Sequence, residues 1–541
     1  MARDTSPVRV QPIILKGGLN LASSVLEIQP GQCLQLFNYE VNTLGRYQRV
    51  MGYERFDGRP APSAVIPAEL PGAPFPDDET GQAAIEAERE ARRAVIGTVP
   101  GAGRILGILQ LKGHVYAFRN AEDGTRAYMY RSTATGWQLV TTPFIQPDGR
   151  YEFCFTNFTG SAGDKEVIGV DGKNKAFRFN GTTYTPIDGP INPDTPIHCE
   201  ALPSQVLLLA YRGGSFVFSS VGDPTKFSPV DGGGEIGCAD EIVKVQLQAN
   251  NACVIFCRHR TYMLYGRSDA DFQLESLSKT TGAISESVQS IGDSVYLDDR
   301  GLTRLDRVQA FGNFEMATIS QLVEPLLVRY VNRVTASFSI KDKNQYRLCF
   351  DDGTGLILTF TGREVAGYST FDLGKTVYCT YSGEGLDGSE VVYFGSDDGY
   401  VYQLERGFTF DGEPVPFVCR PAFLNFGKNN SENKKRFKKL VIEADTVGSA
   451  KVFVTPDFEY SDPSVPFHES TEVAILGGGG YWDEATWDES LWSSASTFTA
   501  DVYIAGVARN ISVTISGEAD KEPPHIVNSL LIHYSPRSRR R

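Results

Sequence analysis

The sequence lacks a long apolar segment. No run approaches the roughly 18 consecutive apolar residues of a membrane-spanning helix, and the N-terminal MARDTSPVRVQPIIL has no apolar core like that of a signal peptide. We therefore expect synthesis in the cytoplasm, without secretion by signal peptide. An excess of basic residues is also lacking, since 52 Lys and Arg face 66 Asp and Glu, for a net charge of -14. Because affinity for DNA comes mainly from clustered Lys and Arg, this balance argues against a general phosphate-binding surface.

Common catalytic and metal-binding motifs are missing as well. No HExxH, Walker A or GxSxG pattern occurs. Cys253, Cys257 and His259 share one face of a predicted strand, but the two thiols would lie about 13 Å apart, whereas zinc needs both sulfurs within about 2.3 Å. We expect no catalytic residue, cofactor or metal, and we interpret the cysteines as buried thiols made in a reducing compartment. They are Cys33, Cys154, Cys199, Cys238, Cys253, Cys257, Cys349, Cys379 and Cys419.

Glycine, proline and aromatic residues are plentiful, and they favour short strands and turns over long helices. The chain has 54 Gly, 29 Pro, 24 Tyr and 32 Phe. Apolar strands alternate with turns at Lys112-Gly113, Asp171-Gly172 and Gly213-Gly214, and similar hairpins recur every 35 to 60 residues, roughly the length of a propeller blade. The sequence therefore predicts an all-β protein with a β-propeller of about six or seven blades. A set of β-sandwiches is the alternative.

Differences in composition and residue pattern divide the chain into four parts. Residues 1–58 form an extended N-terminal scaffold segment, and residues 59–100 form a Pro- and Ala-rich insertion. The second half of this insertion is predicted to be one short helix, supported by an i,i+4 pair of Glu88 and Arg92. Residues 101–415 are assigned to the β-propeller. Residues 416–541 form a C-terminal β-rich platform with a basic tail, and we expect this region and the N-terminal segment to build an additional sandwich-like domain.

Several exposed-looking segments are candidates for contacts with partners. A basic stretch, a tryptophan-rich loop and the basic C-terminus stand out, and their candidate residues are Lys434, Lys435, Arg436, Lys438, Lys439, Trp482, Trp487, Trp492, Arg539, Arg540 and Arg541. The lysines fit a protein contact or protection of a sheet edge better than DNA binding in so acidic a chain. The indoles fit anchoring onto a sheet or subunit. Calcium binding by the carboxylates beside them lacks the EF-hand pattern.

Two segments carry a resemblance to a known family. The opening KGGLNLASSVLEIQPGQCLQLFNYEVNTLGRYQRVMGYERFDGRP contains Gly-Leu-Asn, then Ile28, Pro30, Gly31 and Asn38 in the order IxPGxxxxxxN, and then an arginine pair and Gly-Tyr. The later YFGSDDGYVYQLERGFTFDGEPV is followed by the basic KRFKKLVIE. Together they resemble tail hub or nozzle proteins of short-tailed bacteriophages. The insertion at 59–100 departs from that pattern.

The resemblance implies a structural role in the virion tail. It implies a six-fold ring of identical subunits below the portal-adaptor protein, in contact with tail fibre or needle proteins, which retains the genome and forms the channel for its ejection. DNA would pass through the lumen without sequence-specific contact, and an acidic wall would keep it sliding. Arg46, Arg49 and Arg55 would then pair with acidic neighbours or subunits rather than stack on bases.

Two other functions remain open. A monomeric propeller could act as a binding scaffold for proteins or glycans. A glycan-cleaving tail enzyme would need a pocket with a carboxylate pair, and the sequence places none.

Overall fold

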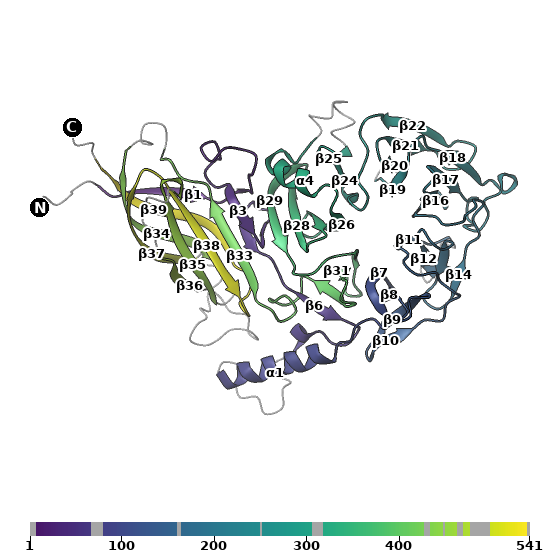
Figure 1. Cartoon of the computed structure of the whole chain (residues 1–541), viewed down its shortest axis with the longest axis horizontal. Coiled ribbons are helices and arrows are strands. Elements are labelled where there is room, and N and C mark those ends of the chain that lie inside the picture. Colours follow the sequence, from purple (N-terminus) through teal and green to yellow (C-terminus); the bar gives the residue numbers. More distant parts are fainter. Residues whose placement is uncertain are drawn as a thin grey trace, which may run out of the picture.

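Strands dominate the computed structural model, as the sequence predicts. It describes residues 7–65, 79–158, 164–248, 252–305, 318–426, 433–446, 449–461, 469–476 and 498–537. Within these residues, no helix is long and apolar enough to cross a membrane. The chain forms two regions that lie side by side, a ring of small sheets and a pair of larger sheets next to it (Figure 1).

Seven antiparallel sheets follow one another around the ring, which identifies a β-propeller. The first two contain β7 (Ala102–Leu111), β8 (His114–Asn120), β9 (Ala127–Thr133) and β10 (Gly136–Leu139), then β11 (Glu152–Thr156), β12 (Glu166–Val170), β13 (Phe177–Phe179) and β14 (Tyr184–Pro186). The third and fourth contain β15 (His198–Ala201), β16 (Leu207–Tyr211), β17 (Ser215–Phe218) and β18 (Gly234–Gly237), then β19 (Ile242–Leu247), β20 (Cys253–Cys257), β21 (Thr261–Tyr265) and β22 (Gln273–Ser278).

The remaining three sheets complete the ring. The fifth contains three described strands, β23 (Gln289–Ile291), β24 (Asp293–Asp298) and β25 (Gly301–Arg304). The sixth contains β26 (Val334–Ile340), β27 (Gln345–Phe350), β28 (Thr354–Thr361) and β29 (Glu364–Asp372). The seventh contains β30 (Cys379–Glu384), β31 (Glu390–Gly395), β32 (Val401–Leu404) and β6 (Tyr53–Phe56). The predicted hairpin turns at Lys112-Gly113 and Gly213-Gly214 each join two of these strands.

Apolar clusters fill the spaces between neighbouring sheets. Strand β16, with the sequence LLLAY, is buried on both faces because side chains alternate along a strand. Leu207 and Leu209 belong to the cluster shared with the second sheet, whereas Leu208 and Ala210 belong to the cluster shared with the fourth. A further cluster joins the seventh sheet to the first, so the ring is closed by packing as well as by hydrogen bonds.

The strand that closes the propeller comes from the N-terminal part of the chain. β6 pairs antiparallel with β32, with Tyr53 opposite Leu404 and Phe56 opposite Val401. Tyr53 is buried, stacks on Phe410 and donates a hydrogen bond from its hydroxyl to the Leu373 carbonyl at 2.6 Å. The sequence-based boundary at residue 58 places this strand in a separate scaffold segment, whereas the structure pairs it with the propeller strand β32.

Strands from both ends of the chain form the two larger sheets, which we call the terminal sheets. One holds β1 (Arg9–Ile14), β39 (Ile526–Pro536), β34 (Lys435–Asp445), β37 (Phe498–Ala508), β5 (Tyr47–Arg49) and β4 (Tyr39–Val41). The other holds β3 (Cys33–Phe37), β33 (Val415–Pro421), β38 (Ile511–Ala519), β35 (Ser449–Phe458) and β36 (Thr471–Leu476), and it continues into the sixth propeller sheet through β29, to which the short β2 (Gly17–Gly18) is also paired. One large apolar cluster lies between the two sheets and extends to the fifth and sixth propeller sheets.

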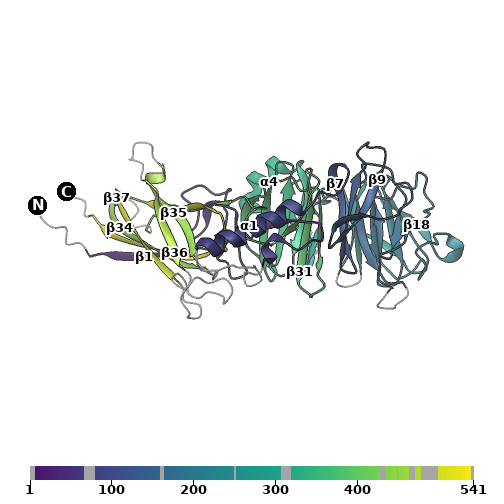
Figure 2. The same cartoon turned by 90° about the horizontal axis from the view of Figure 1, so that it is seen from below.

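Helices are few. α1 (Glu79–Val95) confirms the predicted helix in the insertion, and the expected Glu88–Arg92 pair is present with a 3.1 Å contact. It runs alongside both regions of the molecule (Figure 2). α4 (Glu324–Tyr330) lies between the fifth and sixth sheets, and the 3-10 turns are η1 (Pro62–Ala64), η4 (Pro229–Asp231), η5 (Gln321–Val323) and η6 (Glu459–Ser461).

Candidate binding sites

The first strand of each propeller sheet borders a central cavity of about 720 Å³. β7, β11, β15, β19, β23, β26 and β30 all contribute lining residues. Charged residues such as Glu152, His198 and Lys244 and apolar residues such as Phe155 and Val243 both line it, so the cavity wall is mixed in polarity. Its volume lies in the range of small-molecule sites, about 300–1,000 Å³.

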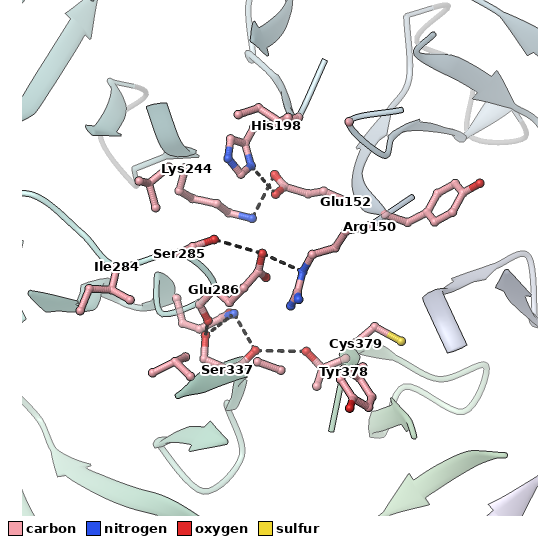
Figure 3. Close-up of a pocket in the computed structure, with 18 of the residues that line it drawn as sticks. Arg150, Glu152, His198, Lys244, Ile284, Ser285, Glu286, Ser337, Tyr378 and Cys379 are labelled. Carbon is pink, nitrogen blue, oxygen red and sulfur yellow. Dashed lines mark hydrogen bonds and ion pairs between the residues drawn. The ribbon is translucent and has the colours of Figure 1, made fainter. Parts of the chain in front are cut away.

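One charged cluster in the cavity joins three successive sheets (Figure 3). The carboxylate of Glu152 on β11 lies 2.7 Å from His198 Nδ1 on β15 and 3.0 Å from Lys244 Nζ on β19. Burial raises the pKa of Glu152, but Lys244 and His198 outweigh it and lower that pKa to about 2. Burial likewise lowers the pKa of Lys244, yet the nearby carboxylates, Glu152 first, leave it raised. Both groups therefore stay ionised and paired near neutral pH.

A second ion pair lies next to this cluster, between it and Ser337 (Figure 3). Arg150 Nε lies 2.7 Å from Glu286 Oε1, and one Arg150 Nη donates to the Thr335 carbonyl at 2.6 Å. Ser337 Oγ donates to the Glu286 carbonyl at 2.5 Å, and Gln289 Nε2 donates to the Ser337 carbonyl at 2.9 Å. These contacts hold the Glu286 segment against β26.

Sequence reasoning missed these cavity residues. Their signal is a charged side chain at the beginning of, or inside, an otherwise apolar first strand, as in EFCFT, HCEA and IVKVQL. It could not be read without knowing which strand of each sheet faces the centre.

The outer face of the first terminal sheet is a second candidate site, which we call the open sheet face. Residues directly opposite each other in antiparallel strands share a face, and the register places Val10, His533, Lys439 and Tyr503 in one row across β1, β39, β34 and β37. The parallel row holds Pro12, Leu531, Val441 and Asp501, and Ile14 and Val507 lie nearby on the same face.

Large apolar side chains on this face are unusually exposed. Tyr503 is 79% exposed, Ile14 65% and Val10 50%. The opposite side chains of the same strands, such as Ile13, Ile442 and Ile504, are buried in the cluster between the terminal sheets. Val441 on the same face is only 8% exposed, so the exposed apolar side chains lie mainly on the outer strands β1 and β37, and they make this face a candidate interaction surface.

The arginines of the N-terminal segment differ in their surroundings. Arg46 is exposed, and its Nη1 lies 3.5 Å from Asp445. Arg55 contacts Asp411 at 2.6 Å and lies over the Tyr400 ring. Arg49 is fully buried and donates to the backbone carbonyls of Val50, Phe408 and Glu522. The first two therefore meet acidic neighbours within the chain, whereas Arg49 is an interior residue away from any surface.

The basic stretch around β34 belongs mainly to the open sheet face. Arg436 and Lys439 point outward there, and Lys439 Nζ lies 2.5 Å from Asp501. Lys434 is exposed and Lys438 half-buried, whereas Lys435 is buried, donates to the Arg509 carbonyl at 2.7 Å, and has a pKa lowered to about 8 by burial. Edge protection is the wrong explanation for these residues, because β34 lies between β37 and β39 inside the sheet.

The remaining sequence-based candidates lie outside the described residues. These are Trp482, Trp487, Trp492, Arg539, Arg540 and Arg541. Among the cysteines, eight are buried as predicted and Cys238 is half-buried, all as free thiols. Within the described ranges, no group of three or more His, Cys, Asp or Glu is placed to hold a metal ion.

Comparisons with known proteins add only distant likenesses. No family model matches the chain, and no curated protein matches it. Similar solved structures include YCF48 bound to D1 peptide, at 12% identity and TM-score 0.39, covering 57% of this chain and 96% of that one. A streptogramin B lyase is 11% identical with a TM-score of 0.39, and the match covers 57% of this chain and 95% of that one. U3-55K is 9% identical with a TM-score of 0.41, and the match covers 57% of this chain and 98% of that one. Such low TM-scores carry no inference, so the propeller assignment rests on strand order and packing.

Proposed function

We propose that the protein is a non-catalytic binding scaffold that assembles with further copies of itself through the open sheet face. In this proposal the terminal sheets form a second, sandwich-like domain attached to the propeller. The observation that carries it is the row from Val10 to Tyr503, whose two ends are exposed apolar side chains and whose middle members are His533 and Lys439. A rigid sheet loses little conformational entropy on docking, which favours such a surface as an interface.

Charge supports a second copy as the occupant. The open sheet face carries Arg436, Lys439 and His533 together with Asp501, which pairs with Lys439, whereas the chain as a whole has a net charge of -14. Another copy therefore brings a mostly acidic surface toward a face that holds both signs of charge, and opposite charges favour correct pairing. Two different faces meeting in this way form a heterologous contact, which closes into a ring when the rotation permits.

A tail hub or nozzle of a short-tailed bacteriophage is the specific form of this function that we propose second. The feature that favours it is the N-terminal segment with Ile28, Pro30, Gly31 and Asn38, which resembles that family. A six-fold ring below a portal-adaptor protein, with tail fibre or needle proteins attached and genomic DNA passing through the lumen, would use the open sheet face as its subunit contact. The location would then be the virion tail.

Assembly state tests both proposals. Wild type, Tyr503→Ser and the control Val230→Ser are compared by light scattering and negative-stain electron microscopy across a concentration series. Val230 is 94% exposed on the propeller, far along the chain from the open sheet face. We expect oligomers from wild type and the control, and a shift of at least about tenfold toward higher concentration for Tyr503→Ser.

The form of the oligomer separates the two proposals. Closed rings with a hole wide enough for duplex DNA support the tail hub, whereas dimers support the general scaffold alone. Monomers at every concentration contradict self-assembly, and oligomers that Tyr503→Ser leaves intact place the interface elsewhere.

A further inference from the structure

The cavity at the centre of the propeller is separate from the open sheet face and has its own chemistry. Two ion-paired clusters lie in it, because Glu152 contacts Lys244 and His198, and Arg150 contacts Glu286; the exposed Arg212 and Glu241 also line the cavity. A charged ligand placed between the two clusters would have to separate one of their pairs and leave a partner without its counter-charge, which is costly for partly buried ions. A neutral ligand leaves both pairs intact.

The paired groups still offer hydrogen bonds to such a ligand. An ammonium group has three N–H donors and a guanidinium five, whereas in the described part of the chain Lys244 contacts only Glu152 and Arg150 uses Nε and one Nη. Glu286 lies beside them with a carboxylate oxygen that can accept. Donors and acceptors therefore alternate over a short distance, the pattern that matches vicinal hydroxyl groups, each of which donates and accepts.

Aromatic rings form another part of the cavity wall. Phe155 is 37% exposed, and its ring meets that of Tyr381 edge-on at a centroid distance of 6.2 Å. Tyr378 also lines the cavity, with the Arg104 guanidinium against its ring. Burial raises the pKa of Tyr381 to about 12, so its hydroxyl remains a donor near neutral pH. Ring faces suit the apolar C–H surface of a sugar, while polar groups suit its hydroxyls.

We propose that the central cavity binds a neutral carbohydrate of one or two sugar rings, held between the Arg150–Glu286 and Lys244–Glu152 pairs. The cavity volume of about 720 Å³ accommodates a ligand of this size. This site depends on the propeller alone and is independent of self-assembly.

Saturation-transfer NMR with the full chain tests the site. The probes are glucose, galactose, mannose and lactose, with glucuronate and glucosamine as charged counterparts. We expect at least one neutral sugar to bind with a Kd on the order of 1 mM, and the charged counterpart to bind about tenfold or more weakly. Preferred binding of a charged probe, or no binding of any probe, overturns the proposal and indicates a water-filled channel only.

Two variants locate the binding. Ser285→Trp adds bulk at the cavity wall next to Glu286, and Val230→Trp adds the same side chain on the distant surface. We expect Ser285→Trp to lose sugar binding and Val230→Trp to keep it. The two variants should have equal melting curves by circular dichroism. If Ser285→Trp does not fold, Glu286→Gln, which keeps an acceptor and removes the charge, should weaken binding about tenfold. Undiminished binding in a folded cavity variant places the sugar elsewhere.

Discussion

The propeller and the terminal sheets are built from strands of very different separation along the sequence. Six propeller sheets each consist of strands that follow one another directly, as β15, β16, β17 and β18 do. The first terminal sheet instead pairs β1 with β39, joining Arg9 to Tyr534. Local pairing closes short loops and non-local pairing closes long ones, so the terminal sheets need both chain ends in place before they form.

The seventh propeller sheet is an exception, because its last strand, β6, comes from the N-terminal part of the chain. It therefore shows how much a non-local strand contributes to the propeller. We expect Tyr53→Ala to lower the free energy of unfolding by about 3–5 kcal/mol, because it removes a buried aromatic ring and the hydrogen bond to Leu373. Denaturant titration with fluorescence and circular dichroism measures the loss. Leu139→Ala, 60% exposed on the outer strand β10, is the control and should change stability by less than about 0.5 kcal/mol. A small effect of Tyr53→Ala would mean that the ring is held without β6.

The same contrast explains what could be predicted from the sequence. The turns at Lys112-Gly113 and Gly213-Gly214 and the helix at 79–95 depend on residues close in sequence, and each is present. The closing role of Tyr53 depends on Leu404, which no local pattern indicates. The inner position of β34 likewise depends on its pairing with β37 and β39, which lie far away in the sequence. The sequence alone therefore suggests, wrongly, that its lysines protect a sheet edge.

The candidate sites were harder to predict for the same reason. Glu152, His198 and Lys244 come from three different sheets and meet only because the sheets form a ring. Val10 and Tyr503 share a face only through two intervening strands. Composition indicates neither site, because each site forms only when side chains that are far apart in the sequence are brought together by the fold.

A buried histidine makes the terminal region sensitive to acid in a way that can sharpen the comparison. His525 Nε2 lies 2.7 Å from the Tyr39 hydroxyl, and burial together with Arg49 lowers the pKa of His525 to about 3. The unfolded chain binds a proton at this residue below its ordinary pKa of 6.5, whereas the folded chain does not until about pH 3. Its contribution to stability is therefore complete above about pH 6.5 and is lost as the pH falls, at up to about 1.4 kcal/mol per pH unit.

Denaturant titration between pH 4 and pH 8 checks this expectation by the difference between wild type and His525→Gln. We expect the variant to be less stable at pH 8, because a packed ring is lost, and to lose less stability on acidification. Cavity groups such as Glu152 titrate in both proteins and cancel in the difference. Equal slopes for the two proteins would show that His525 does not govern the acid sensitivity.

The smallest expected effect concerns the helix that touches both regions. On the propeller side, Arg93 Nε of α1 lies 3.9 Å from Asp411 Oδ1. On the side of the terminal sheets, Glu86 Oε2 of α1 lies 3.9 Å from Lys521 Nζ. Lys521 is 54% exposed, so screening by water leaves its ion pair little energy. We expect Lys521→Ala to change the free energy of unfolding by less than about 0.5 kcal/mol, as should the control Lys175→Ala, which removes a similarly exposed pair within the propeller. If Lys521→Ala alone lowered the free energy of unfolding by more than about 1 kcal/mol, α1 would contribute to holding the two regions together. The expected result leaves that connection to the continuous sheet through β29 and β3, where Thr370 pairs with Phe37.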